Sequence, residues 1–188
     1  SGFLIAVHCK LDILGVFISA FLTAFGGGMT RDVLADRTPY VFTSNLPLSL
    51  VIATVLIAML FKLHKITNLE GKWAFVISDA IGLSSFAITG AIIAIESGFN
   101  FLSAVMLAFI TAVGGGTIRD VLINRMPFIL VSEFYATVAL IIGSVVYILD
   151  AFELRNIFSL IIVFIFGVVL RVLAYYKKWH LPTLSKEN

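Results

Sequence analysis

Glycine, arginine and aspartate recur in one short pattern at two places in this chain, each time inside a long apolar run. Residues 26–34 and 114–122 both read Gly-Gly-Gly-x-x-Arg-Asp-Val-Leu, 88 residues apart, and each copy is followed by a proline, Pro39 or Pro127. The repeated glycines and charged residues are Gly26, Gly27, Gly28, Gly114, Gly115, Gly116, Arg31, Asp32, Arg119 and Asp120. A match this long and in register indicates an internal duplication.

Charged side chains inside an apolar span are restricted in what they can do. Placing one near the bilayer centre costs about 2.5–3.5 kcal/mol, so such residues pair with each other or line water. Adjacent residues of a helix point about 100° apart, so we expect Arg31 and Asp32 to pair poorly with one another. We expect instead that these two residues pair with Arg119 and Asp120 across a pseudo-two-fold axis or contact freed backbone carbonyls. The two stretches would then meet across that axis and frame a polar path.

The glycine triplets predict a kink or a break in each helix, because glycine weakens a helix and has no side chain to pack. A break would free backbone carbonyls that can face a cation, and N–H groups that can face an anion or a carboxylate. The other interpretation is close packing, since small residues allow membrane helices to approach one another. The repeated charges beside the glycines favour a pathway.

Other polar side chains within the apolar runs could line such a path. Asp79 lies one or two turns into its span, where it could line a pore or bind a backbone N–H. The hydroxyl groups that could replace part of an ion's hydration shell belong to Thr23, Thr30, Thr111 and Thr117. Arg171, with Lys177 and Lys178, is expected to extend to the lipid headgroups.

The composition is that of a membrane protein. Of 188 residues, 60% are hydrophobic and 13% charged, with a mean hydropathy of +1.08, whereas soluble domains are nearer half apolar and a quarter charged. A net charge of +2 is too small to indicate a nucleic-acid partner, and the single cysteine, Cys9, excludes an internal disulfide. Because no nucleophile stands with a plausible base and no metal-ligand spacing occurs, we expect no enzyme activity, no metal and no cofactor.

Apolar runs of spanning length predict an all-α integral membrane protein. Full spans are expected at residues 13–36, 46–63, 73–95, 101–123, 129–149 and 156–176. The 88-residue offset places Ser1 inside the first helix of its repeat, so that helix is incomplete, and we expect the natural chain to begin roughly 15 residues earlier. Completing it gives seven transmembrane helices, as two three-helix repeats plus one extra helix. The expected units are residues 1–64, 73–150 and 154–177, with a polar tail at 178–188.

An odd number of spans per repeat means that the second repeat is inverted relative to the first, as in many transporters and channels. Ten of the 13 lysines and arginines fall on one side of this arrangement. The positive-inside rule puts that side in the cytoplasm, together with the C-terminus, and puts the N-terminus outside. We therefore expect a multi-pass protein of the cell's inner (plasma) membrane.

The doubled pattern with its following prolines, and the Ser-Asp-Ala-Ile-Gly-Leu stretch at 78–83, resemble those of the bacterial trimeric intracellular cation channels, the TRIC family, also known as a glycine-transporter-like family. The resemblance covers essentially the whole chain. It implies a homotrimer in the lipid bilayer, in which each seven-helix subunit holds its own pore for monovalent cations such as K⁺ and Na⁺. It also implies that the second and fifth helices are kinked at the glycine triplets.

Two classes of function remain open on the residues. In a potassium-permeable channel, carbonyls and hydroxyls would replace hydration water, and Arg31 and Arg119 would form electrostatic barriers or hold a gate. In a secondary transporter, the inverted repeats would rock around a midplane site for a small zwitterion such as glycine. A scaffold protein would leave the doubled charge pair without a role. We favour the channel, chiefly on the resemblance.

Overall fold

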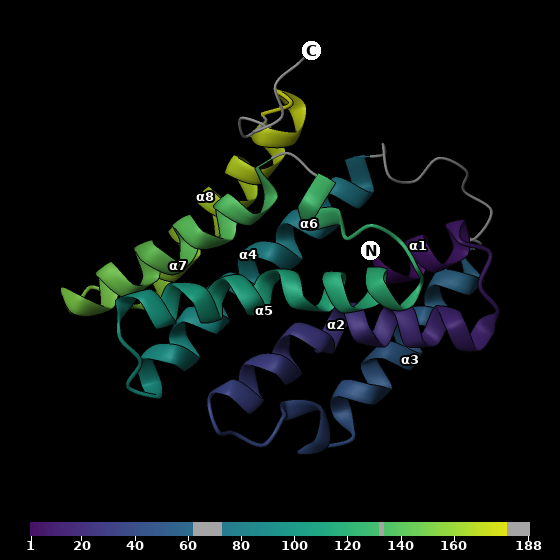
Figure 1. Cartoon of the computed structure of the whole chain (residues 1–188), viewed down its shortest axis with the longest axis horizontal. Coiled ribbons are helices and arrows are strands. Elements are labelled where there is room, and N and C mark those ends of the chain that lie inside the picture. The colour runs from purple at the N-terminus through teal and green to yellow at the C-terminus, as the bar shows by residue number, and fades with distance from the viewer. Residues whose placement is uncertain (62–72, 132–133, 180–188) are drawn as a thin grey trace, which may run out of the picture.

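The computed structural model describes residues 1–61, 73–131 and 134–179, and these residues form helices joined by turns (Figure 1). The helices are α1 (Gly2–His8), α2 (Ile13–Leu34), η1 (Tyr40–Phe42), α3 (Leu46–Leu60), α4 (Trp73–Glu96), α5 (Phe101–Leu122), α6 (Phe128–Val131), α7 (Tyr135–Ala151) and α8 (Ile157–Tyr176). Of these, η1 is a short 3₁₀ helix. The predicted all-α class is confirmed.

Several of these helices are suited to a bilayer. Within the described residues, α2, α4 from Phe75 onward, α5 and α8 are long and apolar enough to cross a membrane. The apolar helices α3 and α7 are shorter, with 15 and 17 residues. Large apolar side chains such as Ile162 of α8, which is 66% exposed, cover the outside of the protein. Because such a surface suits lipid rather than water, the chain is a multi-pass membrane protein.

The 88-residue repeat is present in the backbone as well as in the sequence. Asp12 caps the start of α2, and the equivalent Asn100 caps α5; each side chain accepts a hydrogen bond from the backbone N–H three residues later, at 2.7 Å and 3.0 Å. The turns after α2 and α5 contain Asp36 (φ 55°) and Asn124 (φ 56°), which are also equivalent. Helices α1, α2 and α3 therefore correspond to α4, α5 and α7, and α8 is the additional helix.

The apolar core lies on both sides of α5, which runs across the middle of the molecule in Figure 1. One cluster joins α4, α5, α7 and α8 and contains the fully buried Leu83 and Ile142. A second cluster joins α1, α2 and α3 around Phe3, Val16 and Val51. Since α2 and α5 also pack against each other, the two helices that carry the charge pairs hold the two clusters together.

Two expectations about helix continuity need correction. Both α2 and α5 remain α-helical through their glycine triplets, so the predicted break and its freed carbonyls are wrong. A broken helix would lose backbone hydrogen bonds in an apolar setting, and the tight packing of α2 on α5 keeps the glycines helical. The kink stays a prediction.

The span expected at 129–149 is also wrong, because the structure has two helices there. α6 ends at Val131, and α7 begins at Tyr135, after Phe134 in a left-handed conformation (φ 51°) that an α-helix cannot contain. The sign of this interruption in the sequence was the polar pair Ser132 and Glu133, which divides the apolar run. The end of the span predicted at 46–63 and most of the polar tail predicted at 178–188 lie outside the described residues.

Candidate functional site: the crossing of α2 and α5

Helices α2 and α5 cross with their backbones in direct contact. The glycines at this contact are Gly26, Gly27, Gly114 and Gly115. A Cβ atom on Gly27 would overlap the carbonyl oxygen of Thr111, and a Cβ atom on Gly115 would lie only 2.7 Å from the carbonyl oxygen of Leu22. No larger residue fits these positions without moving a backbone. The close-packing interpretation therefore holds for two glycines of each triplet.

The third glycine of each triplet has a different environment. The nearest atoms to a Cβ on Gly28 or Gly116 would be the Nη2 atoms of Arg31 and Arg119, at 3.8 Å and 3.6 Å. Both glycines line cavities rather than the helix contact. The triplets thus combine a packing surface with an open position beside each guanidinium group.

Each arginine pairs with the aspartate that follows it. Arg31 Nε and Nη2 lie 2.8 Å and 2.7 Å from Asp32 Oδ1, and Arg119 Nε and Nη2 lie 2.9 Å and 2.8 Å from Asp120 Oδ1. The predicted pairing across the pseudo-two-fold axis is therefore wrong. The arginine side chain is long enough to bend across the angle between adjacent positions, so two of its nitrogens bind one carboxylate oxygen.

The second carboxylate oxygen of each aspartate holds the turn that follows the helix. Asp32 Oδ2 accepts a hydrogen bond from the backbone N–H of Tyr40, and Asp120 Oδ2 accepts one from Phe128, both at 3.0 Å. The donor in each case follows the repeated proline. This hydrogen bond fixes the aspartate side chain, so that its other oxygen is available to the adjacent arginine. The prolines at the same offset in both copies were its only sign in the sequence.

One polar contact connects the charge pair of α5 to α2. Arg119 Nη1 donates a hydrogen bond to Thr23 Oγ1 at 3.1 Å, while the Thr23 hydroxyl donates to the carbonyl oxygen of Ser19 at 2.7 Å. The other predicted hydroxyls also donate to the carbonyl four residues earlier in their own helices; they belong to Thr30, Thr111 and Thr117. Each hydroxyl oxygen keeps a lone pair that can accept a further contact.

Two cavities lie beside the two charge pairs. The first, here called the Asp120 cavity, has a volume of about 50 Å³, enough for a few water molecules. The second, here called the Asp32 cavity, is lined by equivalent residues of the first repeat. The equivalent lining positions are 24 and 112, 25 and 113, 28 and 116, 29 and 117, 31 and 119, 32 and 120, 40 and 128, and 41 and 129. The duplication therefore extends to the cavities.

Helix α4 borders both cavities. Asp79 and Ser78 in its first half line the Asp120 cavity, Ser85 and Thr89 line the Asp32 cavity, and Phe86 lines both. Thr23 and Thr117 line the Asp120 cavity, whereas the predicted Thr30 and Thr111 line neither. Thr111 is 1% exposed and lies beneath the α4 backbone at Gly90. Nothing in the sequence predicted that Phe86 lines both cavities.

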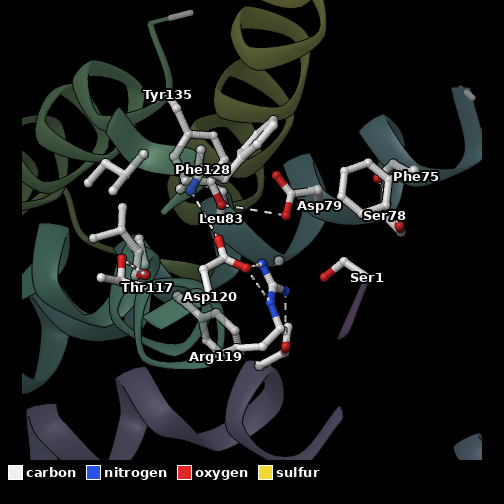
Figure 2. A pocket seen from close by; sticks show the side chains of 17 residues that line it. Ser1, Phe75, Ser78, Asp79, Leu83, Thr117, Arg119, Asp120, Phe128 and Tyr135 are labelled. Carbon is white, nitrogen blue, oxygen red and sulfur yellow. Dashed lines mark hydrogen bonds and ion pairs between the residues drawn. The ribbon is translucent and has the colours of Figure 1, made fainter. Parts of the chain in front are cut away.

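An aromatic cluster backs the Asp120 cavity, and Figure 2 shows the Tyr135 hydroxyl directed at Asp79. That hydroxyl lies 3.5 Å from Asp79 Oδ1. The Arg171 guanidinium of α8 lies 4.8 Å from the centre of the Tyr135 ring and 5.9 Å from that of Phe128. Arg171 is only 2% exposed, so its predicted extension to the headgroups is wrong. The faces of the Tyr135 and Phe128 rings attract the positively charged guanidinium, which turns the Arg171 side chain into the protein.

Comparisons with known proteins give consistent matches. The family model described as "Glycine transporter" matches residues 1–63 and 76–151. The Bacillus subtilis UPF0126 membrane protein YvgT is 36% identical over 186 residues, covering 98% of this chain and 90% of that protein. The Escherichia coli UPF0126 inner membrane protein YadS is 40% identical over 147 residues, covering 78% of this chain and 70% of that protein.

Solved structures extend these matches to the fold. A TRIC cation channel studied for its conductance has a TM-score of 0.87 at 35% identity, covering 100% of this chain and 91% of that one. The trimeric intracellular cation channel orthologue from Rhodobacter sphaeroides has a TM-score of 0.84 at 30% identity, covering 94% of this chain and 90% of that one.

Proposed function

The chain belongs to the TRIC channel family, whose family model carries the description "Glycine transporter", and from this membership we propose that it is a cation channel permeable to K⁺ and Na⁺. Its structural neighbours are channels, and the chain is not an enzyme. We place the pore within each subunit, with no cofactor other than the transported ion. The observation that carries this proposal is the pair of equivalent cavities, each lined by an arginine–aspartate ion pair.

The proposed path follows one side of α4. It runs from Ser78 and Asp79 in the Asp120 cavity, past Phe86, to Ser85 and Thr89 in the Asp32 cavity. The hydroxyls and carboxylates along it supply the oxygen atoms that replace hydration water around a monovalent cation. Phe86 borders both cavities and forms an apolar barrier between them. An apolar constriction of this kind restricts ion passage by excluding water.

We place the gate at the crossing of α2 and α5. The two helices contact each other through glycine backbone, so a small rotation of one changes the path without having to displace large side chains. Kinks at Gly26–Gly28 and Gly114–Gly116 would supply such a movement. The hydrogen bond from Arg119 to Thr23 joins the two helices and would hold the closed arrangement.

Glycine transport is the alternative, and the description of the family model favours it. A secondary transporter of this type binds the substrate carboxylate at the N-terminal end of a half-helix near the membrane midplane. α2 and α5 continue without interruption, so their triplets offer no such end. The continuity of these helices favours the channel.

The assembly and orientation form part of the same proposal. The Rhodobacter sphaeroides orthologue is described as trimeric, and the Escherichia coli relative as an inner membrane protein. We propose a homotrimer in the inner (plasma) membrane, with lipid against the exposed apolar faces and no nucleic-acid partner. Our proposal puts the N-terminus outside and the C-terminus in the cytoplasm, because the excess of lysine and arginine on one side supports this orientation. Residues 1–64 and 73–150 act as the inverted repeats, and 154–177 forms the seventh helix.

Flux through purified protein in liposomes tests the proposal. K⁺ efflux and uptake of labelled glycine would be measured on the same preparations, with protein-free liposomes as the control. We expect K⁺ efflux that does not saturate with concentration over the millimolar range, and no glycine uptake above the control. Saturable glycine uptake without K⁺ efflux would instead establish the transporter.

A further inference from the structure

The charges that line the two equivalent cavities differ. In each cavity an arginine and an aspartate form an ion pair, so their charges cancel. The Asp120 cavity contains one additional acidic side chain, Asp79, whereas the lining of the Asp32 cavity has no further charged residue among those the structure describes. Counting only the side chains that line each cavity, the Asp120 cavity therefore carries one more negative charge than the Asp32 cavity, and this charge comes from α4 rather than from the repeated stretch.

The carboxylate of Asp79 is less fully engaged than that of Asp120. Asp120 binds at both oxygens, with contacts of 2.8 to 3.0 Å to Arg119 and to the Phe128 N–H. The contact between Asp79 and the Tyr135 hydroxyl is 3.5 Å long, at the outer limit for a hydrogen bond. A carboxylate has about four lone-pair sites. Asp79 can therefore bind a cation without first losing a strong partner.

Neutral oxygen atoms are available around Asp79. The Ser78 hydroxyl donates to the carbonyl oxygen of Phe75, and the Thr117 hydroxyl donates to that of Val113, which leaves lone pairs on both oxygens. These side chains and Tyr135 line the same cavity as Asp79 (Figure 2). Its volume of about 50 Å³ allows an ion to keep part of its hydration.

We propose that Asp79 forms a binding site for a monovalent cation in the Asp120 cavity, together with the hydroxyl oxygens of Tyr135, Ser78 and Thr117, and that this site sets the preference for cations over anions. The proposal rests on the channel function proposed above. Arg171 acts as a positioning residue, because its guanidinium fixes the Tyr135 ring and puts a positive charge behind it. That charge keeps cation binding weak, as conduction requires.

Reversal potentials in a KCl gradient test this site. The full chain would be reconstituted as the wild type, Asp79→Asn, Asp79→Glu and, as a matched control, Asp150→Asn, which removes a partly exposed aspartate paired with Arg155. We expect the K⁺ to Cl⁻ permeability ratio to fall by about tenfold in D79N, because a full charge is lost near the ion. D79E and D150N should keep the wild-type ratio.

Restoring the charge chemically provides a second measurement that does not depend on the folding of D79N. In a Cys9→Ser background, Asp79→Cys would be treated with a negatively charged or a positively charged methanethiosulfonate. We expect the negative reagent to restore cation selectivity and the positive reagent to abolish it. A cation-selective wild type whose selectivity is unchanged in D79N and D79C would overturn the site and leave the channel intact. A wild type without K⁺ current would overturn both proposals.

Discussion

At the scale of single residues, the charge pairs differ most from expectation. The sequence predicts that Arg31, Asp32, Arg119 and Asp120 are intramembrane and shows that they are repeated. The structure buries Asp32, Arg119 and Asp120 and leaves Arg31 partly exposed. Their partners could not be predicted, because adjacent pairing depends on a hydrogen bond to a backbone N–H eight residues away. The burial of Arg171 depends in the same way on aromatic rings that only the folded chain brings near it.

Replacing Asp120 with asparagine should strongly destabilise the protein. The change leaves the Arg119 guanidinium buried without its counter-ion, and breaking a buried pair costs about 3–5 kcal/mol. We expect the melting temperature in detergent to fall by about 10 °C. Asp150→Asn is the control, because the pair it breaks is partly exposed and contributes less than about 1 kcal/mol. Equal effects of the two substitutions would contradict the structural role of the buried pair.

Thr23→Val removes the acceptor for Arg119 while preserving the shape of the side chain. If this hydrogen bond holds the gate closed, its loss should raise the single-channel open probability by about fivefold, the effect of a bond of about 1 kcal/mol. Thr54→Val serves as the control, since that exposed hydroxyl on α3 bonds only within its own helix. An unchanged open probability in Thr23→Val would show that the hydrogen bond from Arg119 to Thr23 does not hold the gate closed.

At the scale of helices, the apolar runs predicted both ends of α2, α4, α5 and α8 to within two residues. Asp12 and Asn100, which cap α2 and α5, stand before these runs and favour helix starts there. The separation of α6 from α7 was not predicted, although Ser132 and Glu133 interrupt the apolar run between the end of α6 and the start of α7. The continuity of α2 and α5 also could not be predicted, because it depends on the packing of one glycine triplet against the other.

Alanine substitutions distinguish glycines at a close helix contact from glycines that have open space beside them. Gly27→Ala places a methyl group against the Thr111 carbonyl and should destabilise the protein by about 3 kcal/mol. Gly82→Ala, on α4, has no neighbouring atom within 4 Å and should stabilise the helix by up to about 1 kcal/mol. Thermal unfolding in detergent measures both. A Gly27→Ala protein as stable as the wild type would show that the helices do not cross as closely as described.

At the scale of the whole molecule, we propose that the two duplicated cavities form one path along the face of α4 that borders both of them. The duplication and its 88-residue offset were evident in the sequence, and so was the presence of Asp79. The position of Phe86 between the cavities was not evident, because phenylalanine occurs in every predicted span of this chain. The assignment of that residue to a barrier therefore rests on the packing of α4 against both repeats.

Shortening Phe86 tests this barrier. Phe86→Ala should raise the K⁺ conductance by at least about threefold, because it removes the apolar group between two polar cavities. Phe166→Ala, on the exposed face of α8, should leave the conductance unchanged. Conductance is measured on single channels at fixed KCl concentration. A lower or unchanged conductance in Phe86→Ala would place the path elsewhere in the subunit.

Single-channel recording of the wild-type protein in a planar lipid bilayer tests the central claim most directly. With a KCl gradient across the bilayer, a cation channel predicts stepwise currents that reverse near the K⁺ equilibrium potential. Replacement of Arg119 or Asp120 should alter these currents. The absence of unitary currents from protein that takes up glycine in liposomes would contradict the channel and make the α2–α5 crossing part of a transporter.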